Sequence, residues 1–148
     1  AQFIELAQPY LKQPLDANDE YSQRALALAR ERIHHLADIG PAAEYFFHDD
    51  YEMDAKGAAK HFTPTSRDLL AQLHEKLSTL PEAGWNHDNI ESALRGLAEE
   101  RDIKPAALIH PARLAVSGRT VGPSVFELLE ALGRERVLRR LQRESERV

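Results

Sequence analysis

The sequence has no cysteine among its 148 residues, which excludes a disulfide framework and a cysteine-ligated zinc site. Long apolar runs are also missing, because charged residues interrupt each hydrophobic stretch, so a membrane-spanning helix is not expected. The first residues, AQFIELAQPYLKQ, have neither the basic start nor the long apolar segment of a secretory signal peptide. These absences predict a soluble, cytoplasmic protein, and the 43% of hydrophobic residues is enough to form a core.

Motifs that bind phosphates or activate a nucleophile are absent as well. The sequence contains no GxGxxG, GxxxxGK(S/T) or GxSxG motif. Its seven histidines include no HExxH motif and no two that are four residues apart. His87 and Glu91 can share a helix face, but a zinc site needs three or four protein ligands. We therefore expect no catalytic residue, no metal site and no cofactor in this chain.

Charge is distributed unevenly along the chain, whose formal net charge is −5. Residues 1–100 hold nine Lys/Arg and eighteen Asp/Glu, whereas residues 101–148 hold ten Lys/Arg and six Asp/Glu. Nearly all of the positive charge in the last third is arginine. This asymmetry is typical of a surface that faces a polyanion, but from charge alone ordinary surface charge is the preferred explanation.

Apolar residues recur every three or four positions along most of the sequence, and strand-like alternation is nearly absent. This periodicity predicts an all-α fold, a multi-helix bundle of about seven to eight short helices. The aromatic residues of the segment AAEYFF are expected to anchor a core. A break at Thr63-Pro64 divides the chain into two predicted helical subdomains, residues 1–64 and residues 65–148.

Two of the predicted helices bear on function. The first long helix is expected to begin at Asp19, a suitable N-cap, and to end near Asp38, because Gly40-Pro41 follows. The last helix is expected to run from Arg134 towards the carboxyl terminus with its valine and leucines facing inward. Four of its arginines lie at i, i+4, i+7 and i+11 and would form a single basic face: Arg136, Arg140, Arg143 and Arg147.

The segment HPARLAVSGRTVGPSVFELLEALGRERVLRRL, residues 110–141, has the most unusual composition. It places prolines, glycines and hydroxyl groups between two apolar helical stripes, where a plain helix connection of 2–8 residues needs fewer. The helix after Gly122-Pro123 begins with unpaired backbone N–H groups, which suit a phosphate or a base. Arg113 and Arg119 flank the turn and can bond to splayed RNA bases or phosphates. A tight interhelical turn with exposed arginines explains the same residues.

This segment resembles the terminal motif of bacterial glutamyl-tRNA synthetases, which are class I aminoacyl-tRNA synthetases. That motif reads Pro-x-Arg-x-Ala-hydrophobic-Thr/Ser-Gly, a turn, Gly-Pro-x-hydrophobic-Phe-Glu and Leu-Gly. Upstream, RERIHHLADIGPAAEYFFHDDYEMDAKGAAKHFTPTSRDLL and WNHDNIESALRGLAEERDIK are similar to family segments in the same order. The resemblance covers nearly the whole chain and implies an α-helical anticodon-binding region, residues 1–148, that grips the anticodon loop of glutamate tRNA.

The resemblance also implies which residues touch the tRNA. Arg113 matches the family's arginine after Pro-x, and Gly122, Pro123 and Val125 match the positions that contact the second and third anticodon bases. Ser124 stands where many members have glycine. Gly122 stands where others have Ser or Thr, so a side-chain contact there would be replaced by backbone.

An arginine on the first long helix is implied for the wobble cytosine, where it favours glutamate tRNA over glutamine tRNA. Arg32 fits that place best, and its neighbour Arg30 stays open.

The catalytic Rossmann domain of that family, with its HIGH-like and KMSKS-like motifs, is not in this sequence. ATP, magnesium and glutamate would bind there, so glutamylation is expected of a catalytic domain outside this chain. A piece of a longer synthetase and a free-standing relative both fit, and a monomer is expected. The alternative function is a helical protein–protein interaction module, suggested by the overall acidity and the aromatic cluster near Tyr45. A DNA-binding helix-turn-helix is a more distant alternative, because the first hundred residues are acidic.

Overall fold

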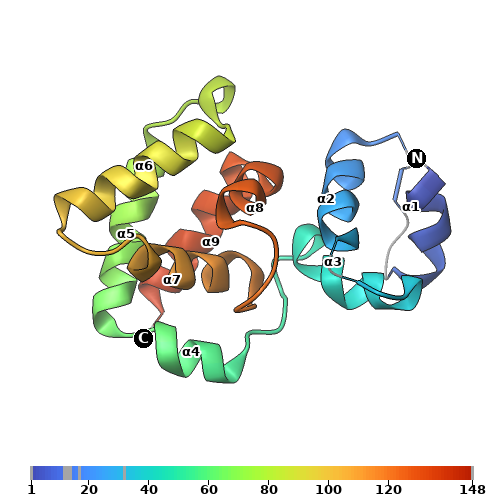
Figure 1. Cartoon of the computed structure of the whole chain (residues 1–148), viewed down its shortest axis with the longest axis horizontal. Coiled ribbons are helices and arrows are strands. Elements are labelled where there is room, and N and C mark those ends of the chain that lie inside the picture. Colours follow the sequence, from blue (N-terminus) through green and yellow to red (C-terminus); the bar gives the residue numbers. More distant parts are fainter. Residues whose placement is uncertain (1, 12–14, 17, 32, 148) are drawn as a thin grey trace. The chain divides into compact units, whose positions relative to one another are not determined.

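The computed structural model describes residues 2–11, 15–16, 18–31 and 33–147. These residues form nine α-helices and three short 3₁₀ helices, and they contain no strand (Figure 1). The all-α prediction is therefore confirmed. None of the helices in these ranges is long and apolar enough to cross a membrane.

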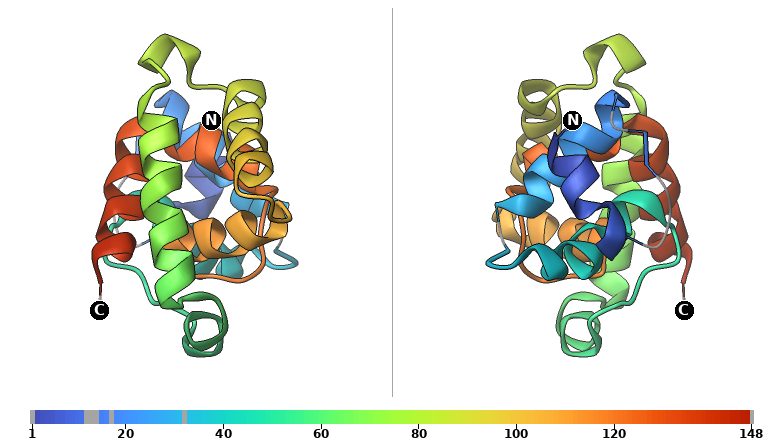
Figure 2. Two further views of the ribbon diagram at one scale, coloured as in Figure 1. Left: turned by 90° about the vertical axis from the view of Figure 1, so that its left-hand side faces the viewer. Right: turned by 90° about the vertical axis from the view of Figure 1, so that its right-hand side faces the viewer.

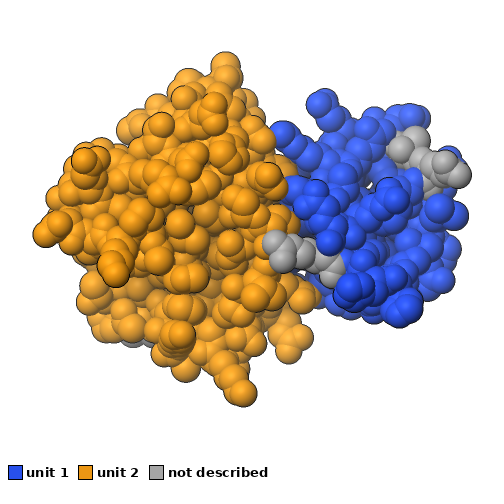
Figure 3. Space-filling model, viewed as in Figure 1, with its two compact units in different colours: residues 1–51 blue, residues 52–148 orange. Residues whose placement is uncertain are grey.

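The chain divides into two compact units, residues 1–51 and residues 52–148 (Figure 3). This division lies well before the break predicted at Thr63-Pro64. The reason is that the helix preceding Thr63-Pro64 packs within the second unit: the Asp54 N–H donates to the Gly118 carbonyl at 2.8 Å. The sequence break is real as a helix boundary, because Thr63 and Ser66 form a capping box, but it is not the boundary between units.

The first unit contains helices α1 (Gln2–Ala7), α2 (Glu20–Arg30) and α3 (Ile39–Phe47), with 3₁₀ helices η1 (Gln8–Tyr10) and η2 (Leu36–Asp38). The Asp19 side chain accepts from the Ser22 N–H at 3.0 Å and caps α2 as predicted. The core of the first unit includes fully buried side chains from α2 and α3: Leu26, Ile39 and Phe46.

The predicted end of the first long helix is wrong, because α2 stops at Arg30. His35 has extended backbone, and a new helix, α3, begins at Ile39. Gly40 and Pro41 lie in the first turn of α3, where a proline loses no intrahelical hydrogen bond. Glycine is required here by close packing, since a Cβ at position 40 would lie 2.5 Å from the Tyr10 carbonyl oxygen.

The second unit contains α4 (Ala55–His61), α5 (Pro64–Ser78), η3 (Glu82–Gly84), α6 (His87–Glu100), α7 (Ala106–Ser117), α8 (Val125–Leu132) and α9 (Arg134–Glu146). Helix α5 packs against α6, α7 and α9, and Figure 2 shows α5 and α9 side by side in both views. Fully buried leucines come from five helices of this unit and include Leu70, Leu73, Leu77, Leu94, Leu108, Leu114, Leu129 and Leu141.

The predicted basic face of α9 is interrupted by one buried arginine. Arg140 is fully buried, and its Nη1 donates to the Val116 carbonyl at 2.7 Å. Glu144, one turn later, is also buried and forms ion pairs with Arg143 at 2.9 Å and Arg147 at 3.4 Å. Much of the positive charge of α9 therefore serves internal contacts of this unit.

Candidate nucleic-acid interface

The turn between α7 and α8, residues 118–124, starts at a left-handed glycine. Gly118 has φ 74° and ψ 5°, and its N–H donates to the Leu114 carbonyl at 2.7 Å. This is a typical helix end, which glycine adopts without the steric cost of a Cβ. The Gly118 carbonyl accepts from the Asp54 N–H, so the start of α4 holds the turn on its other side.

A buried hydroxyl group organises the first half of the turn. Ser117 is 2% exposed, and its Oγ donates to the Arg113 carbonyl at 2.7 Å and accepts from the Arg119 N–H at 3.1 Å. The side chain therefore satisfies a carbonyl near the end of α7 and an amide in the turn. The serine of the motif is a structural residue and does not face solvent.

Arg113 closes the second half of the turn. Its Nη1 donates to the Pro123 carbonyl, and its side chain is half-buried. Sequence reasoning placed this arginine outward as a ligand for RNA, whereas the structure uses it to hold the turn closed. Gly122, at φ 155°, lies beside it, and a Cβ there would be 3.7 Å from Arg113 Nη1.

Val125 lies in the hydrophobic core at 2% exposure, and Pro123 is buried as well. Any contact of Val125 with a ligand would therefore run through its backbone N–H. Ser124 makes no side-chain cap, and the first helical bond of α8 joins the Leu128 N–H to the Ser124 carbonyl at 2.9 Å. The first N–H groups of α8 have no intrahelical acceptor, which leaves them suited to an anion or a carbonyl oxygen.

Thr120, Val121 and Ser124 form the exposed tip of the turn. Sequence reasoning did not select Thr120 or Val121. Val121 is 74% exposed, and a branched apolar side chain in that position offers a flat contact for a base or another apolar group. The sequence signal for Val121 was its position in SGRTVGPS, after two polar residues and before a glycine. An apolar residue in that position belongs to no apolar helix face and is therefore expected to be exposed.

A surface hollow of about 310 Å³ lies beside this tip, lined by Glu52, Asp54, Gly118, Arg119, Thr120 and Val121. Its volume is at the lower end of the range of roughly 300–1,000 Å³ for small-ligand pockets. The lining combines carboxylates, a guanidinium, a hydroxyl and an apolar edge. The hollow therefore offers both hydrogen-bond donors and hydrogen-bond acceptors to the edge of a planar polar group.

The hydrogen bonds of the turn and the hollow bring together Arg113, Arg119, Gly122 and Pro123, with Val125 at the start of α8. Arg32 lies outside the described residues. Arg30 is exposed in the first unit, where its guanidinium lies over the Phe3 ring at 4.8 Å.

Helices α4 and α7, which flank the turn, carry a histidine pair. The His61 and His110 rings stack with their centroids 5.1 Å apart. Burial lowers the pKa of His61 from its ordinary value of 6.5, and His110 and Lys60 lower this pKa further by charge repulsion. The neutral form of His61 is therefore favoured in the folded protein.

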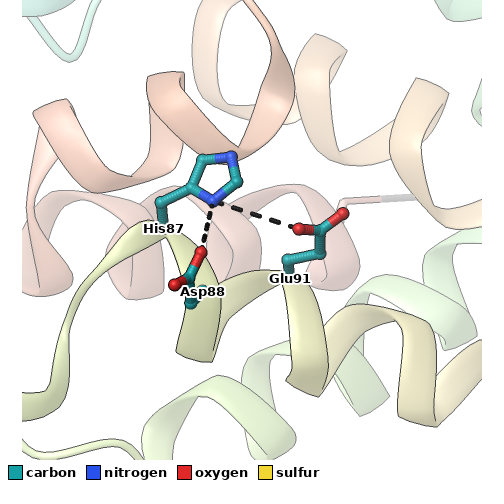
Figure 4. Close-up of side chains that lie close together, drawn as sticks. All are labelled: His87, Asp88 and Glu91. Carbon is teal, nitrogen blue, oxygen red and sulfur yellow. Dashed lines mark hydrogen bonds and ion pairs between the residues drawn. The ribbon is translucent and has the colours of Figure 1, made fainter.

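A second polar cluster lies at the start of α6 (Figure 4). His87 Nδ1 is 3.1 Å from Asp88 and 4.0 Å from Glu91, and the three potential ligand atoms lie within 4.8 Å of one another. Glu91 also accepts from Arg95 at 2.9 Å, and the His87 ring packs edge-on against Phe126 on α8. The polar contacts of this cluster all lie within α6, and the ring contact of His87 with Phe126 links the cluster to α8.

Comparison with known proteins now places the fold. A family model described as "Anticodon binding domain" matches residues 2–144. The chain belongs to the anticodon binding domain family. The turn of residues 118–124 thus lies within the matched anticodon binding domain.

Curated relatives of this anticodon binding domain are glutamate–tRNA ligases. That of Moorella thermoacetica is 46% identical over 139 residues, which cover 93% of this chain and 28% of the relative. That of Desulforudis audaxviator is 38% identical over 151 residues, which cover 97% and 30%. The chain therefore spans less than a third of the curated relatives that it matches.

Solved structures agree with these relatives. The crystal structure of a glutamate tRNA ligase from Elizabethkingia meningosepticum in complex with its amino acid matches with a TM-score of 0.81 and 26% identity. The match covers 98% of this chain and 28% of that one. Glutamate-tRNA synthetase from Elizabethkingia anophelis matches with a TM-score of 0.76 at 25% identity, over 99% of this chain and 27% of the other.

Proposed function

We propose that this domain binds and reads the anticodon loop of glutamate tRNA as the anticodon-binding part of a glutamate–tRNA ligase. The observation that carries the proposal is the turn of residues 118–124, whose tip is exposed and whose shape is fixed by hydrogen bonds with Asp54, Arg113 and Ser117. This turn lies in a chain whose curated relatives are glutamate–tRNA ligases. Glutamylation, with ATP, magnesium and glutamate, would take place on a catalytic domain outside this sequence. The tRNA and that domain are the proposed partners, with a monomer in the cytoplasm as the proposed state.

The chemistry of the turn supports base reading rather than phosphate binding alone. The hollow beside Val121 offers carboxylates as acceptors and Arg119 as a donor, so it can distinguish the donor and acceptor pattern of a splayed base. The exposed Val121 side chain adds an apolar contact of the kind that a base face accepts. Because the turn is fixed by hydrogen bonds before any ligand arrives, little ordering cost is expected on binding.

The alternative, a protein–protein interaction module, has lost one of its supports. Its aromatic cluster lies largely in the core, because Tyr45 is 4% exposed and Phe46 is fully buried. The first unit uses aromatic rings for internal packing: the Tyr45 and Phe46 ring centroids lie 4.5 Å apart, and Phe47 packs edge-on against Tyr21.

The test is to measure the dissociation constant of the 148-residue chain for a glutamate tRNA transcript and for the same transcript with its second and third anticodon bases exchanged. We expect about a tenfold or larger preference for the cognate anticodon, since a specific base contact contributes roughly 1–3 kcal/mol. Affinity should also fall as salt rises, because phosphate contacts release counterions. Equal affinity for the two transcripts would overturn the proposal.

The variant Val121→Ser tests the place of contact. The side chain is 74% exposed, so its replacement should leave the free energy of unfolding within about 0.5 kcal/mol of the wild type. We expect weaker binding of the cognate transcript and little change for the exchanged one. If the cognate dissociation constant does not change, the base contact does not lie at Val121.

A further inference from the structure

Arg140 is the largest side chain that is fully buried in the described part of the chain. An arginine almost never reaches this state unless its charge and its N–H groups are matched inside the protein. Its Nη1 donates to the Val116 carbonyl at 2.7 Å, across a separation of 24 residues. Val116 is itself fully buried and is the second-last residue of α7.

This bond is important because Val116 lies at the carboxyl end of α7, next to the turn. At the carboxyl end of a helix the carbonyl groups lose the amide partners that continue the helical pattern. At the end of α7 the Gly118 N–H still donates to the Leu114 carbonyl, and the Ser117 hydroxyl donates to the Arg113 carbonyl. The Val116 carbonyl accepts a hydrogen bond from Arg140 on α9. A distant helix thus fixes the residue that precedes Ser117 and the turn.

From these contacts we infer that Arg140 is a positioning residue for the tRNA-reading turn, acting through Val116 and Ser117, an inference that rests on the proposed function. Arg140 is not among the residues that line the hollow. It holds the carboxyl end of α7, and the same helix carries Arg113, whose guanidinium closes the turn on Pro123. Losing the anchor lets the end of α7 shift, and the turn shifts with it.

The experiment compares Arg140→Met with Arg139→Met in the 148-residue chain. Both variants lose one positive charge from α9, but Arg139 is 46% exposed and ion-paired with Glu135 at its own surface. The readout is the ratio of dissociation constants for the exchanged and the cognate tRNA transcripts. A merely structural residue lowers the folded fraction, which scales both apparent affinities alike and leaves this ratio unchanged.

We expect the ratio to fall by about tenfold in Arg140→Met and to stay at the wild-type value in Arg139→Met. Arg140→Lys, which keeps a charged donor, should restore part of the discrimination. Equal ratios in Arg140→Met and Arg139→Met would overturn the inference.

A second measurement needs no RNA and remains available if Arg140→Met folds poorly. In Arg140→Lys and Arg140→Gln, the amide NMR resonances of Gly118 and Gly122 should move, whereas in Arg139→Met they should match the wild type. Unmoved glycine resonances in both Arg140 variants would also overturn the inference. If these resonances move but the wild type does not discriminate between the transcripts, the proposed function fails and the anchoring of the turn by Arg140 stands.

Discussion

At the scale of single residues, the guanidinium of Arg113 illustrates how one side chain can define a recognition surface without being its most exposed part. It is half-buried, and it donates to the carbonyl of Pro123, which is buried too. A buried carbonyl that loses its donor costs roughly 1–3 kcal/mol. The turn therefore depends on Arg113 for its shape, whatever the residue also contributes to a bound tRNA.

Arg113→Met tests this dependence. The apolar part of the side chain is kept, and the donor to Pro123 is removed. We expect the free energy of unfolding to fall by about 1–2 kcal/mol and the affinity for glutamate tRNA to fall by about tenfold. Urea denaturation and a binding titration measure the two quantities. A variant with wild-type stability would show that the bond to Pro123 does not hold the turn.

Glycine at position 57 is a second single-residue constraint. A Cβ there would lie 2.5 Å from Thr120 Cγ2 and 2.9 Å from Asp54 Oδ2, so α4 and the turn can approach closely only without a side chain. Gly57→Ala should lower the free energy of unfolding despite the better helix propensity of alanine. Gly96 in α6 has nothing within 4 Å of its Cβ position, and Gly96→Ala should raise stability by about 0.5–1 kcal/mol. Urea denaturation midpoints of the two variants measure both effects. A Gly57→Ala variant more stable than the wild type would contradict the close contact between α4 and the turn.

At the scale of elements, the packing of α4 on α7 should depend on pH through the stacked His61 and His110 rings. The pKa of His61 is lowered in the folded state, so below its ordinary value of 6.5 the unfolded chain binds more protons than the folded chain. The contribution of His61 to the free energy of unfolding is therefore fully present above pH 6.5. This contribution declines as pH falls through that value towards the lowered pKa of the folded state.

The corresponding measurement compares the wild type with His110→Gln in urea at pH 7 and at pH 5.5. The variant removes the charge repulsion but not the burial, which is the larger cause. We expect it to lose less stability between the two pH values than the wild type does. Identical losses would mean that His110 does not influence the protonation of His61.

The elements also show which features the sequence can predict. Local signals succeeded at Asp19, which caps α2, because a cap needs only neighbours within a few residues. The end of α2 at Arg30 was missed, because neither glycine nor proline stands near that position to mark it.

Arg140 was misplaced for the same kind of reason. Periodicity placed it on a basic face, whereas it serves a carbonyl 24 residues earlier, and no local pattern reports a partner at that distance. In the turn, the inward direction of Val125 and the hydrogen bond of Arg113 to Pro123 required the structure.

At the scale of the whole molecule, the unfolding of the second unit can be followed by its own fluorescence signal. The single tryptophan, Trp85, belongs to the second unit, where its Nε1 donates to the Leu129 carbonyl at 3.0 Å. The fully buried leucines of that unit pack among its own helices. We therefore expect this core to form without residues 1–51.

We expect a chain of residues 52–148 to unfold cooperatively in urea, with a Trp85 fluorescence midpoint close to that of the 148-residue chain. The physical reason is that denaturant unfolding of a unit follows the surface which that unit buries. Loss of cooperativity in the shorter chain would show that residues 1–51 are needed for the core of the second unit.

The amide of Asp54 offers a direct view of how often the turn opens. Its proton is engaged by the Gly118 carbonyl, so it can exchange with deuterated solvent only when α4 and the turn part. The exchange rate of this one proton therefore counts the openings of the free domain, and its slowing on addition of a ligand reports occupation of the turn without any label on the partner.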